Sequence, residues 1–289
     1  IAIDPEYAIA YSGMANCYYD SYYFRWLPID KSLPLAVEAA NKAVQLDDQS
    51  AESHIALARI NIWSIWNFTR ALKELEKGIK INPNSVEGNK QLGVWHMFMG
   101  NYEKGNNYLQ KADELDPFSL VNIAYIGSYH FLDGDYEKMI VYGNRLITME
   151  PNFHYGHYLL GCGLLFQQQY KEAITEGELA VKLTGEQDLQ TLHWLGFTYG
   201  INGEKEKALI ILKKIDNLPI SKDKIFNAYA LVYYSMSEWD KAFEYDEQAT
   251  LNQEPNVLFI KSIYRDWFPE MMNDQRTKKL FDLMDSKIK

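Results

Sequence analysis

The sequence has little cysteine, and its two thiols, Cys17 and Cys162, are too few for a disulfide framework. No stretch approaches the roughly 18 apolar residues of a membrane-spanning helix, and the first residues lack a signal-peptide pattern. Basic residues are in the minority, since 29 Lys and Arg stand against 39 Asp and Glu, a net charge of −10. That charge disfavours binding to nucleic acid or to an anionic membrane surface. These absences predict a soluble, cytoplasmic protein.

Apolar residues are abundant and make up 47% of the 289 residues. This content is too high for a disordered segment and is enough for a substantial core. The apolar residues recur three and four positions apart, for example between residues 159 and 183, which is the periodicity of helices. No stretch shows a sustained alternation of period two. The sequence therefore predicts an all-α fold.

An internal repeat organises the chain. A small residue beside a large apolar one recurs at intervals of 34 or 35 residues, after a first interval of 43. About a dozen residues later a second helix is expected to begin, and an Asp-Pro, Asn-Pro or Glu-Pro pair closes several of the units. Periods of this length are typical of stacked helical hairpins, each covering the apolar face of its neighbour. The recurring small residues, which let paired helices approach closely, are Ala15, Ala58, Gly93, Gly127, Gly161, Gly196 and Ala230.

The period, the small residue in the first helix, the early alanine of the second and the closing proline together resemble the tetratricopeptide repeat. The resemblance covers residues 1–254 and implies a right-handed α-solenoid of about seven helical hairpins. Residues 255–289 lose the spacing, and Leu280, Leu283 and Met284 predict one last amphipathic helix. We therefore expect a solenoid over residues 1–254 and a C-terminal capping segment over 255–289.

The first hairpin carries an aromatic insertion within residues 18–34, which we expect to lengthen the connection between its two helices. One interpretation is that the rings fold over the open end of the stack and cap it, because terminal repeats must hide an apolar face. The alternative is a structural or self-associating scaffold, in which the insertion from Tyr22 to Trp26 pairs two copies of the chain as a homodimer.

A narrower resemblance combines this insertion with the turn from Trp63 to Phe68 and with the closing Phe268-Pro269-Glu270-Met271 stretch. Together they are similar to the C-terminal tetratricopeptide regions of bacterial signalling and regulatory proteins. In those proteins the repeats follow a winged-helix, nucleotide cyclase or protein kinase domain. The resemblance implies a sensory or scaffolding module that controls an attached effector. Because the first residues look like the end of a second repeat helix, we expect a longer protein with a further domain upstream.

Chemistry-bearing motifs are scarce. His96 and His130 occupy equivalent repeat positions and are interpreted as packing residues. His154 and His157 are three apart on one helix, but no further ligand pair stands at metal-binding spacing. We therefore expect no metal, no cofactor and no catalysis. A helical-repeat enzyme that uses His154, His157 or His193 as a base is the weaker alternative.

The concave side of such a solenoid is lined by the first helices, and projecting the family's inner positions gives an aromatic centre with polar flanks. We expect this groove to bind a protein partner, as an apolar or aromatic peptide segment or as the attached effector domain. Phe131 and Phe166 could instead pack against neighbouring second helices, whereas Tyr155 and Tyr158 combine a flat ring with a hydrogen-bond donor. The expected groove residues are Arg59, Trp63, Lys90, Phe131, Tyr155, Tyr158, Phe166, His193 and Asn227.

Overall fold

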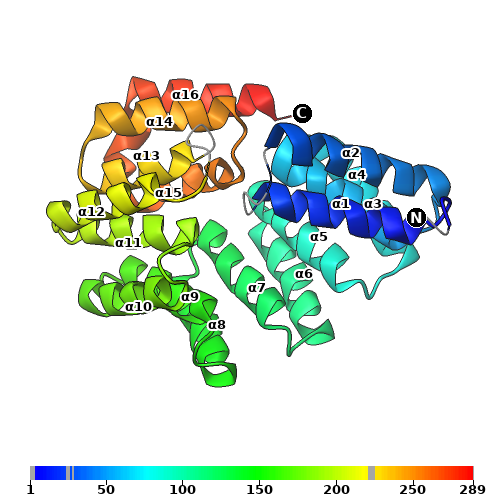
Figure 1. The fold of residues 1–289 in the computed structure, drawn as a ribbon, viewed down its shortest axis with the longest axis horizontal. Helices are drawn as coiled ribbons and strands as arrows, with labels where there is room; N and C mark the ends of the chain where they lie inside the picture. The colour runs from blue at the N-terminus through cyan, green and yellow to red at the C-terminus, as the bar shows by residue number, and fades with distance from the viewer. Residues whose placement is uncertain (1–3, 24–26, 28, 221–224, 289) are drawn as a thin grey trace. The chain divides into compact units, whose positions relative to one another are not determined.

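A computed structural model describes residues 4–23, 27, 29–220 and 225–288, and these residues form helices and turns without a strand. The chain divides into two compact units, which are described separately. Unit 1 comprises residues 1–117 and 285–289, and unit 2 comprises residues 118–284. Figure 1 shows the helices of both units. The predicted all-α fold of helical hairpins is confirmed.

Unit 1 contains three consecutive helical hairpins. Their first helices pack in order, α1 against α3 and α3 against α5, and each also packs against the second helix of its own hairpin. The hairpins are α1 (Ala8–Tyr23) with α2 (Ile29–Leu46), α3 (Ala51–Ile60) and η1 (Asn61–Ile65) with α4 (Phe68–Ile81), and α5 (Val86–Phe98) with α6 (Tyr102–Leu115).

Unit 2 contains four further hairpins followed by a C-terminal region of short helices. Here the first helices α7, α9, α11 and α13 pack in that order. The hairpins are α7 (Leu120–Asp133) with α8 (Tyr136–Met149), α9 (His154–Phe166) with α10 (Tyr170–Leu183), α11 (Leu189–Ile201) with α12 (Lys205–Asp216), and α13 (Phe226–Ser235) with α14 (Trp239–Leu251). The C-terminal helices are η3 (Pro255–Phe259), α15 (Ile260–Trp267), η4 (Pro269–Asn273) and α16 (Gln275–Lys287).

Side-chain caps explain why the first helices begin at the same place in successive repeats. The hydroxyls of Ser50, Ser85 and Ser119 each accept a hydrogen bond from the backbone N–H three residues later. Asp188 caps α11 in the same way. Each cap satisfies one of the backbone donors that a helix start leaves without a partner.

Two features depart from a regular hairpin. The second hairpin ends its first helix in a π-helical turn, followed by Trp66 in the left-handed conformation (φ 56°) and fully buried. In the first hairpin, most of the insertion is helical rather than a loop, because α1 continues to Tyr23 and α2 begins at Ile29. Residues 24–26 and 28, and the side chains of Tyr22 and Tyr23, lie outside the described part of the chain. The pairing surface expected between Tyr22 and Trp26 therefore falls outside it.

Candidate binding surface

The expected groove residues fall in both units, and each group is described by itself. Arg59, Trp63 and Lys90 belong to unit 1, and the other six belong to unit 2. No helix among the described residues has the length and apolar character needed to cross a membrane.

In unit 1 the two basic residues among the expected groove residues, Arg59 and Lys90, each pair with a neighbouring carboxylate. Arg59 donates to Asp20 Oδ1 at 2.8 Å, and its guanidinium lies 4.2 Å from the ring centre of Tyr19. Lys90 Nζ lies 2.6 Å from Glu87 Oε2. Burial acts to raise the pKa of Glu87, but the charges of Lys90 and Arg59 outweigh it and lower that pKa to about 2. Both cations are thus engaged within unit 1.

Trp63 is also engaged within unit 1. Its side chain is buried, and its indole Nε1 donates to Gln91 Oε1 of α5 at 3.1 Å. The ring meets Phe98 edge-on with 5.4 Å between centroids. These contacts join the second and third hairpins.

Unit 2 carries a cluster of rings on its first helices, which we call the aromatic floor: Phe131, Phe166, Trp194 and Phe197. Trp194 lies at its centre, with its ring 6.0 Å from Phe131, 6.3 Å from Phe166 and 5.4 Å from Phe197. All three contacts are edge-on, the geometry that aromatic pairs prefer. The floor therefore joins three successive first helices of unit 2: α7, α9 and α11.

A C-terminal segment, Pro255–Phe268, covers this floor. The ring of Trp267 lies 5.1 Å from Phe166 and 5.8 Å from Phe197. Phe259 lies 6.0 Å from Phe131. Two of the expected groove residues, Phe131 and Phe166, thus contact a distant part of their own chain.

Polar contacts fix the same segment at its edge. Tyr136, the first residue of α8, donates a short hydrogen bond from its hydroxyl to Asp266 Oδ2. Arg265 Nη1 donates to the backbone carbonyl of Leu132 at 3.1 Å. The ring of Tyr136 also stacks on Phe166, with 4.2 Å between centroids and 9° between planes. Burial, together with the neighbouring Asp266 carboxylate, raises the pKa of Tyr136, so the phenol stays a donor.

Tyr155 and Tyr158 lie beside the floor and outside the C-terminal segment's contacts described above. The Tyr155 hydroxyl donates to Gln190 Oε1 at 2.8 Å, and Gln190 Nε2 donates to the Tyr158 hydroxyl at 3.1 Å. Tyr158 is buried and meets Trp194 edge-on at 6.4 Å. Tyr155 is half-buried and lies 6.3 Å from Tyr125 of α7. One glutamine therefore holds two phenols where the floor meets the surface.

His193 and Asn227 are each only 2% exposed, so neither presents a free surface. His193 Nδ1 lies 2.9 Å from the carbonyl oxygen of Leu189, and burial lowers the pKa of the ring to about 4. The Asn227 amide acts on the buried carboxyl of Asp246 on α14 and favours its charged form. These two residues belong to the interior of the helix array.

His157 uses both ring nitrogens in structural contacts. Its Nδ1 lies 2.6 Å from Glu176 Oε2, and its Nε2 lies 2.9 Å from the carbonyl oxygen of Pro151. His54 repeats this arrangement in unit 1 with Glu74 and the carbonyl of Asp48, a parallel that the sequence reasoning missed. In each case the histidine of a first helix contacts a glutamate of the second helix and a backbone carbonyl of the turn before the first helix.

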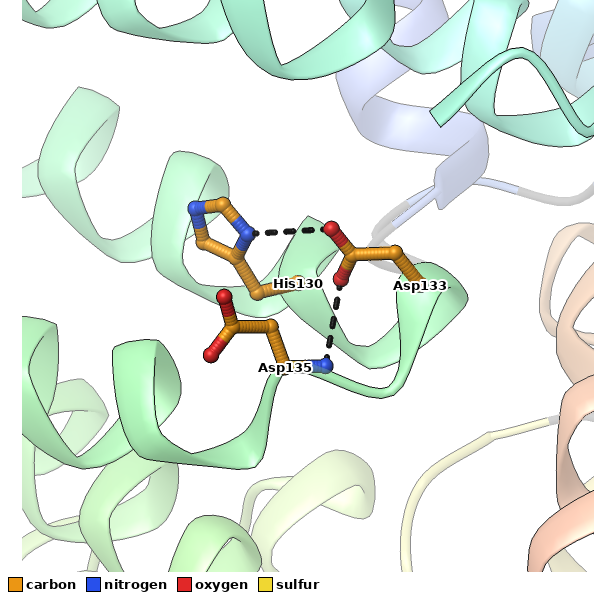
Figure 2. A group of neighbouring side chains, drawn as sticks. All are labelled: His130, Asp133 and Asp135. Carbon is orange, nitrogen blue, oxygen red and sulfur yellow. Dashed lines mark hydrogen bonds and ion pairs between the residues drawn. The ribbon is translucent and has the colours of Figure 1, made fainter. Parts of the chain in front are cut away.

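Figure 2 shows His130, Asp133 and Asp135 at the turn between α7 and α8, where one potential ligand atom from each lies within 4.8 Å of the others. His130 Nδ1 is 3.7 Å from Asp133 Oδ2. Asp135, however, caps α8 by accepting from the Lys138 N–H at 3.1 Å, and its other oxygen lies 3.1 Å from Lys138 Nζ. The arrangement accounts for the start of α8.

The preceding hairpin places His96 in the same position without the acids. His96 stacks on Tyr108 at 5.6 Å, and His130 stacks on Tyr142 at 5.7 Å. Both histidines therefore pack against the second helix of their hairpin, whether or not carboxylates follow. The residues that correspond to the two aspartates are Met99 and Asn101.

Sequence reasoning missed the residues that complete the floor. The sequence reasoning did not place four residues in a binding surface: Trp194, Tyr136, Asp266 and Trp267. The last two lie in residues 255–289, which were assigned to capping. The signal that could have found them is the Arg-Asp-Trp-Phe stretch, which places two large rings after a charged pair near the C-terminus.

No protein-family model matches the sequence, and no curated protein sequence matches it. Solved structures do resemble the fold. PilW, described as a widely conserved type IV pilus biogenesis factor, is 14% identical with a TM-score of 0.53, covering 89% of this chain and 98% of PilW. PilF of Pseudomonas aeruginosa is 17% identical with a TM-score of 0.52, covering 81% of this chain and 96% of PilF.

A monomeric mutant of IFIT1, solved with Gppp-AAAA, is 14% identical with a TM-score of 0.60, covering 89% of this chain and 68% of that protein. At these identities the likeness shows the fold alone. The fold is that of a tetratricopeptide-repeat solenoid.

Proposed function

We propose that this chain is a non-catalytic protein-interaction module that binds a peptide segment on the first-helix side of unit 2. The observation that carries the proposal is the pair of phenols, Tyr155 and Tyr158, held by Gln190 beside the aromatic floor. Tyr155 is half-buried while Tyr158 is buried behind it, and a tyrosine that is partly exposed and fixed in orientation, as Tyr155 is, is a typical anchor of protein interfaces.

The chemistry of the surface favours an apolar or aromatic partner segment. Tyr125 and Tyr155 present neighbouring rings, and Val121, one helical turn before Tyr125, is 54% exposed. Burying an anchor side chain there contributes about 1.5–3 kcal/mol. Gln190 supplies the polar group that fixes the orientation of a bound segment.

The narrower sequence resemblance, to repeat regions of bacterial signalling and regulatory proteins, extends the proposal to the cellular role of the chain. On that basis the chain serves a bacterial signalling or regulatory protein in the cytoplasm, where the bound segment is a partner protein or the attached effector domain. This extension rests on the resemblance and not on the phenol pair.

A selection of displayed short peptides against the full chain tests the proposal. We expect enrichment of peptides with apolar and aromatic residues, and at least a ten-fold loss of affinity in Tyr155→Ala, about 1.4 kcal/mol. Gln190→Ala should weaken the same peptides because both phenols lose their shared partner.

The matched control is Tyr170→Ala, which truncates a half-buried tyrosine at the start of the second helix α10. Peptide affinity should be unchanged in this variant. Selected peptides that bind Tyr155→Ala and Gln190→Ala as tightly as the wild type would contradict the proposed site.

A further inference from the structure

The C-terminal segment has two faces with different contacts. One face packs within the C-terminal part of unit 2, where Tyr264 lies 5.3 Å from Tyr234 of α13 and their hydroxyls share a short hydrogen bond. The other face, with Trp267 and Asp266, meets the aromatic floor and Tyr136. The two sets of contacts use different side chains, Tyr264 in the first and Asp266 and Trp267 in the second.

The contacts on the floor are directional as well as apolar. Trp267 occupies the position between Phe166 and Phe197, Asp266 accepts from the Tyr136 hydroxyl, and Arg265 donates to the carbonyl of Leu132. An aromatic anchor flanked by hydrogen bonds that fix its register is how grooves recognise peptide segments. The floor therefore binds Trp267 of its own chain, while Tyr136 and the Leu132 carbonyl at its edge bind the two residues before it, Asp266 and Arg265.

This internal binding is incomplete in two respects. The Trp267 Nε1 atom is buried and has no hydrogen-bond partner among the described residues, and a buried donor without a partner destabilises the contact that buries it. The helix that presents the three side chains is only eight residues long, and 3-10 turns with a proline at their start flank it on both sides. A helix this short contributes little stability of its own.

Tyr158 is the member of the phenol pair that contacts the floor, because its ring lies 6.4 Å from that of Trp194. A partner segment that begins on Tyr155 and continues along the first helices reaches Trp194 and then the place that Trp267 occupies. The two occupants of the floor would therefore exclude each other.

We propose that the Arg265-Asp266-Trp267 stretch is an internal ligand of the aromatic floor, and that the partner segment displaces it by presenting the same chemistry: an acidic residue directly followed by an aromatic one. The inference rests on the proposed function and names the partner's anchor. The chain's own segment then lowers the apparent affinity for the partner in proportion to the time it occupies the floor.

The test uses a fluorescent synthetic peptide with the sequence of residues 259–268, titrated into the full chain. We expect the Trp267→Ala variant to bind it at least ten-fold more tightly than the wild type, because the place between Phe166 and Phe197 is vacated while Tyr264 is retained. A Trp267→Ala version of the peptide should not bind. Phe281→Ala, which truncates a ring of α16 that packs on Tyr264, is the matched control and should behave as the wild type.

Circular dichroism establishes that Trp267→Ala is folded. If it is not, Tyr136→Phe provides the test instead, because it removes only the hydroxyl that holds Asp266 and should raise peptide affinity by a smaller factor. Equal affinity of the wild type and the folded variant, or no binding to that variant, overturns the inference.

The two proposals fail in different experiments. Selected peptides that need Tyr155 but gain nothing from Trp267→Ala would retain the proposed function and remove the internal ligand. Binding of the 259–268 peptide to Trp267→Ala, with no dependence of any peptide on Tyr155 or Gln190, would retain the internal contact and remove the proposed site.

Discussion

The hydroxyl of Tyr136 donates a hydrogen bond to the carboxylate of Asp266, which lies 130 residues further along the chain. The bond joins the start of α8 in the first hairpin of unit 2 to the end of α15, beyond the fourth hairpin. Since Asp266 also lies 2.5 Å from Arg265 Nε, the carboxylate links the phenol to a guanidinium that reaches the carbonyl of Leu132.

Tyr136→Phe should loosen α15 without disturbing the hairpins. The ring and its stacking on Phe166 remain, while Asp266 loses one charge-assisted hydrogen bond worth roughly 1.5–3 kcal/mol. We expect amide hydrogen exchange in residues 260–267 to accelerate by at least ten-fold, with smaller changes in α9 and α11.

Tyr170→Phe is the control for this change, because Tyr170 begins α10 as Tyr136 begins α8. Exchange in residues 260–267 should not respond to it. Equal protection of α15 in Tyr136→Phe and the wild type would show that the hydrogen bond does not hold the segment.

Asp246 should make stability fall as pH rises. Its side chain is fully buried on α14, and burial raises its pKa to about 8; the neighbouring Tyr234 and Asn227 oppose this shift and Glu254 adds to it. An unfolded aspartate titrates near about 3.9, so between about pH 4 and about pH 8 the native state holds a proton that the unfolded state lacks. This carboxyl therefore favours folding most below about pH 4, and its contribution is lost as pH rises to about 8.

Asp246→Asn cannot ionise and should not show this loss. In urea unfolding, the stability of the variant relative to the wild type should increase between about pH 5 and about pH 8, by at most about 1.4 kcal/mol per pH unit. Comparing the two proteins at each pH cancels the titration of other groups. A difference that stays constant across the window would assign Asp246 an ordinary pKa.

Gly127→Ala should destabilise unit 2 more than Gly161→Ala does. A Cβ at Gly127 would collide with Leu159 Cδ2 and lie 2.7 Å from Tyr142 Cβ, but at Gly161 the nearest atom is the Ala173 carbonyl oxygen at 3.3 Å. Overpacking costs about 1–3 kcal/mol, while alanine gains up to about 1 kcal/mol of helix propensity over glycine.

The same urea unfolding measures both glycine variants. The two positions are matched, since each lies in a first helix at the recurring small-residue site. Similar stabilities for Gly127→Ala and Gly161→Ala would mean that α7 can move away from α9 at no cost.

The period of 34 or 35 residues was enough to predict the hairpins, because each contact of that pattern joins neighbouring repeats. Contacts within one hairpin recur with the same period, as at Gly93, where a Cβ would lie 2.7 Å from Leu109 of its own hairpin. The helical course of residues 18–23 and 29–34 was not predicted, because this stretch was interpreted as an insertion that lengthens the connection between the first two helices.

The candidate surface was harder to predict than the fold. Tyr155 and Tyr158 follow from inner positions of a single repeat, and Gln190 occupies an inner position of the next. Trp267 does not follow from the repeat, because its contacts with Phe166 and Phe197 join residues that no periodicity relates. Aromatic content alone does not distinguish a free surface from one that the chain covers itself.

The contact between α15 and α7 also constrains how unit 2 can evolve and fold. In an ordinary solenoid each hairpin is coupled only to its nearest neighbours, so hairpins can be added, lost or unfolded one at a time. Here Arg265 must reach the carbonyl of Leu132 across the intervening hairpins. Inserting or deleting a hairpin would separate these partners, so this hydrogen bond couples the first hairpin of unit 2 to its C-terminal region, which lies beyond the fourth hairpin.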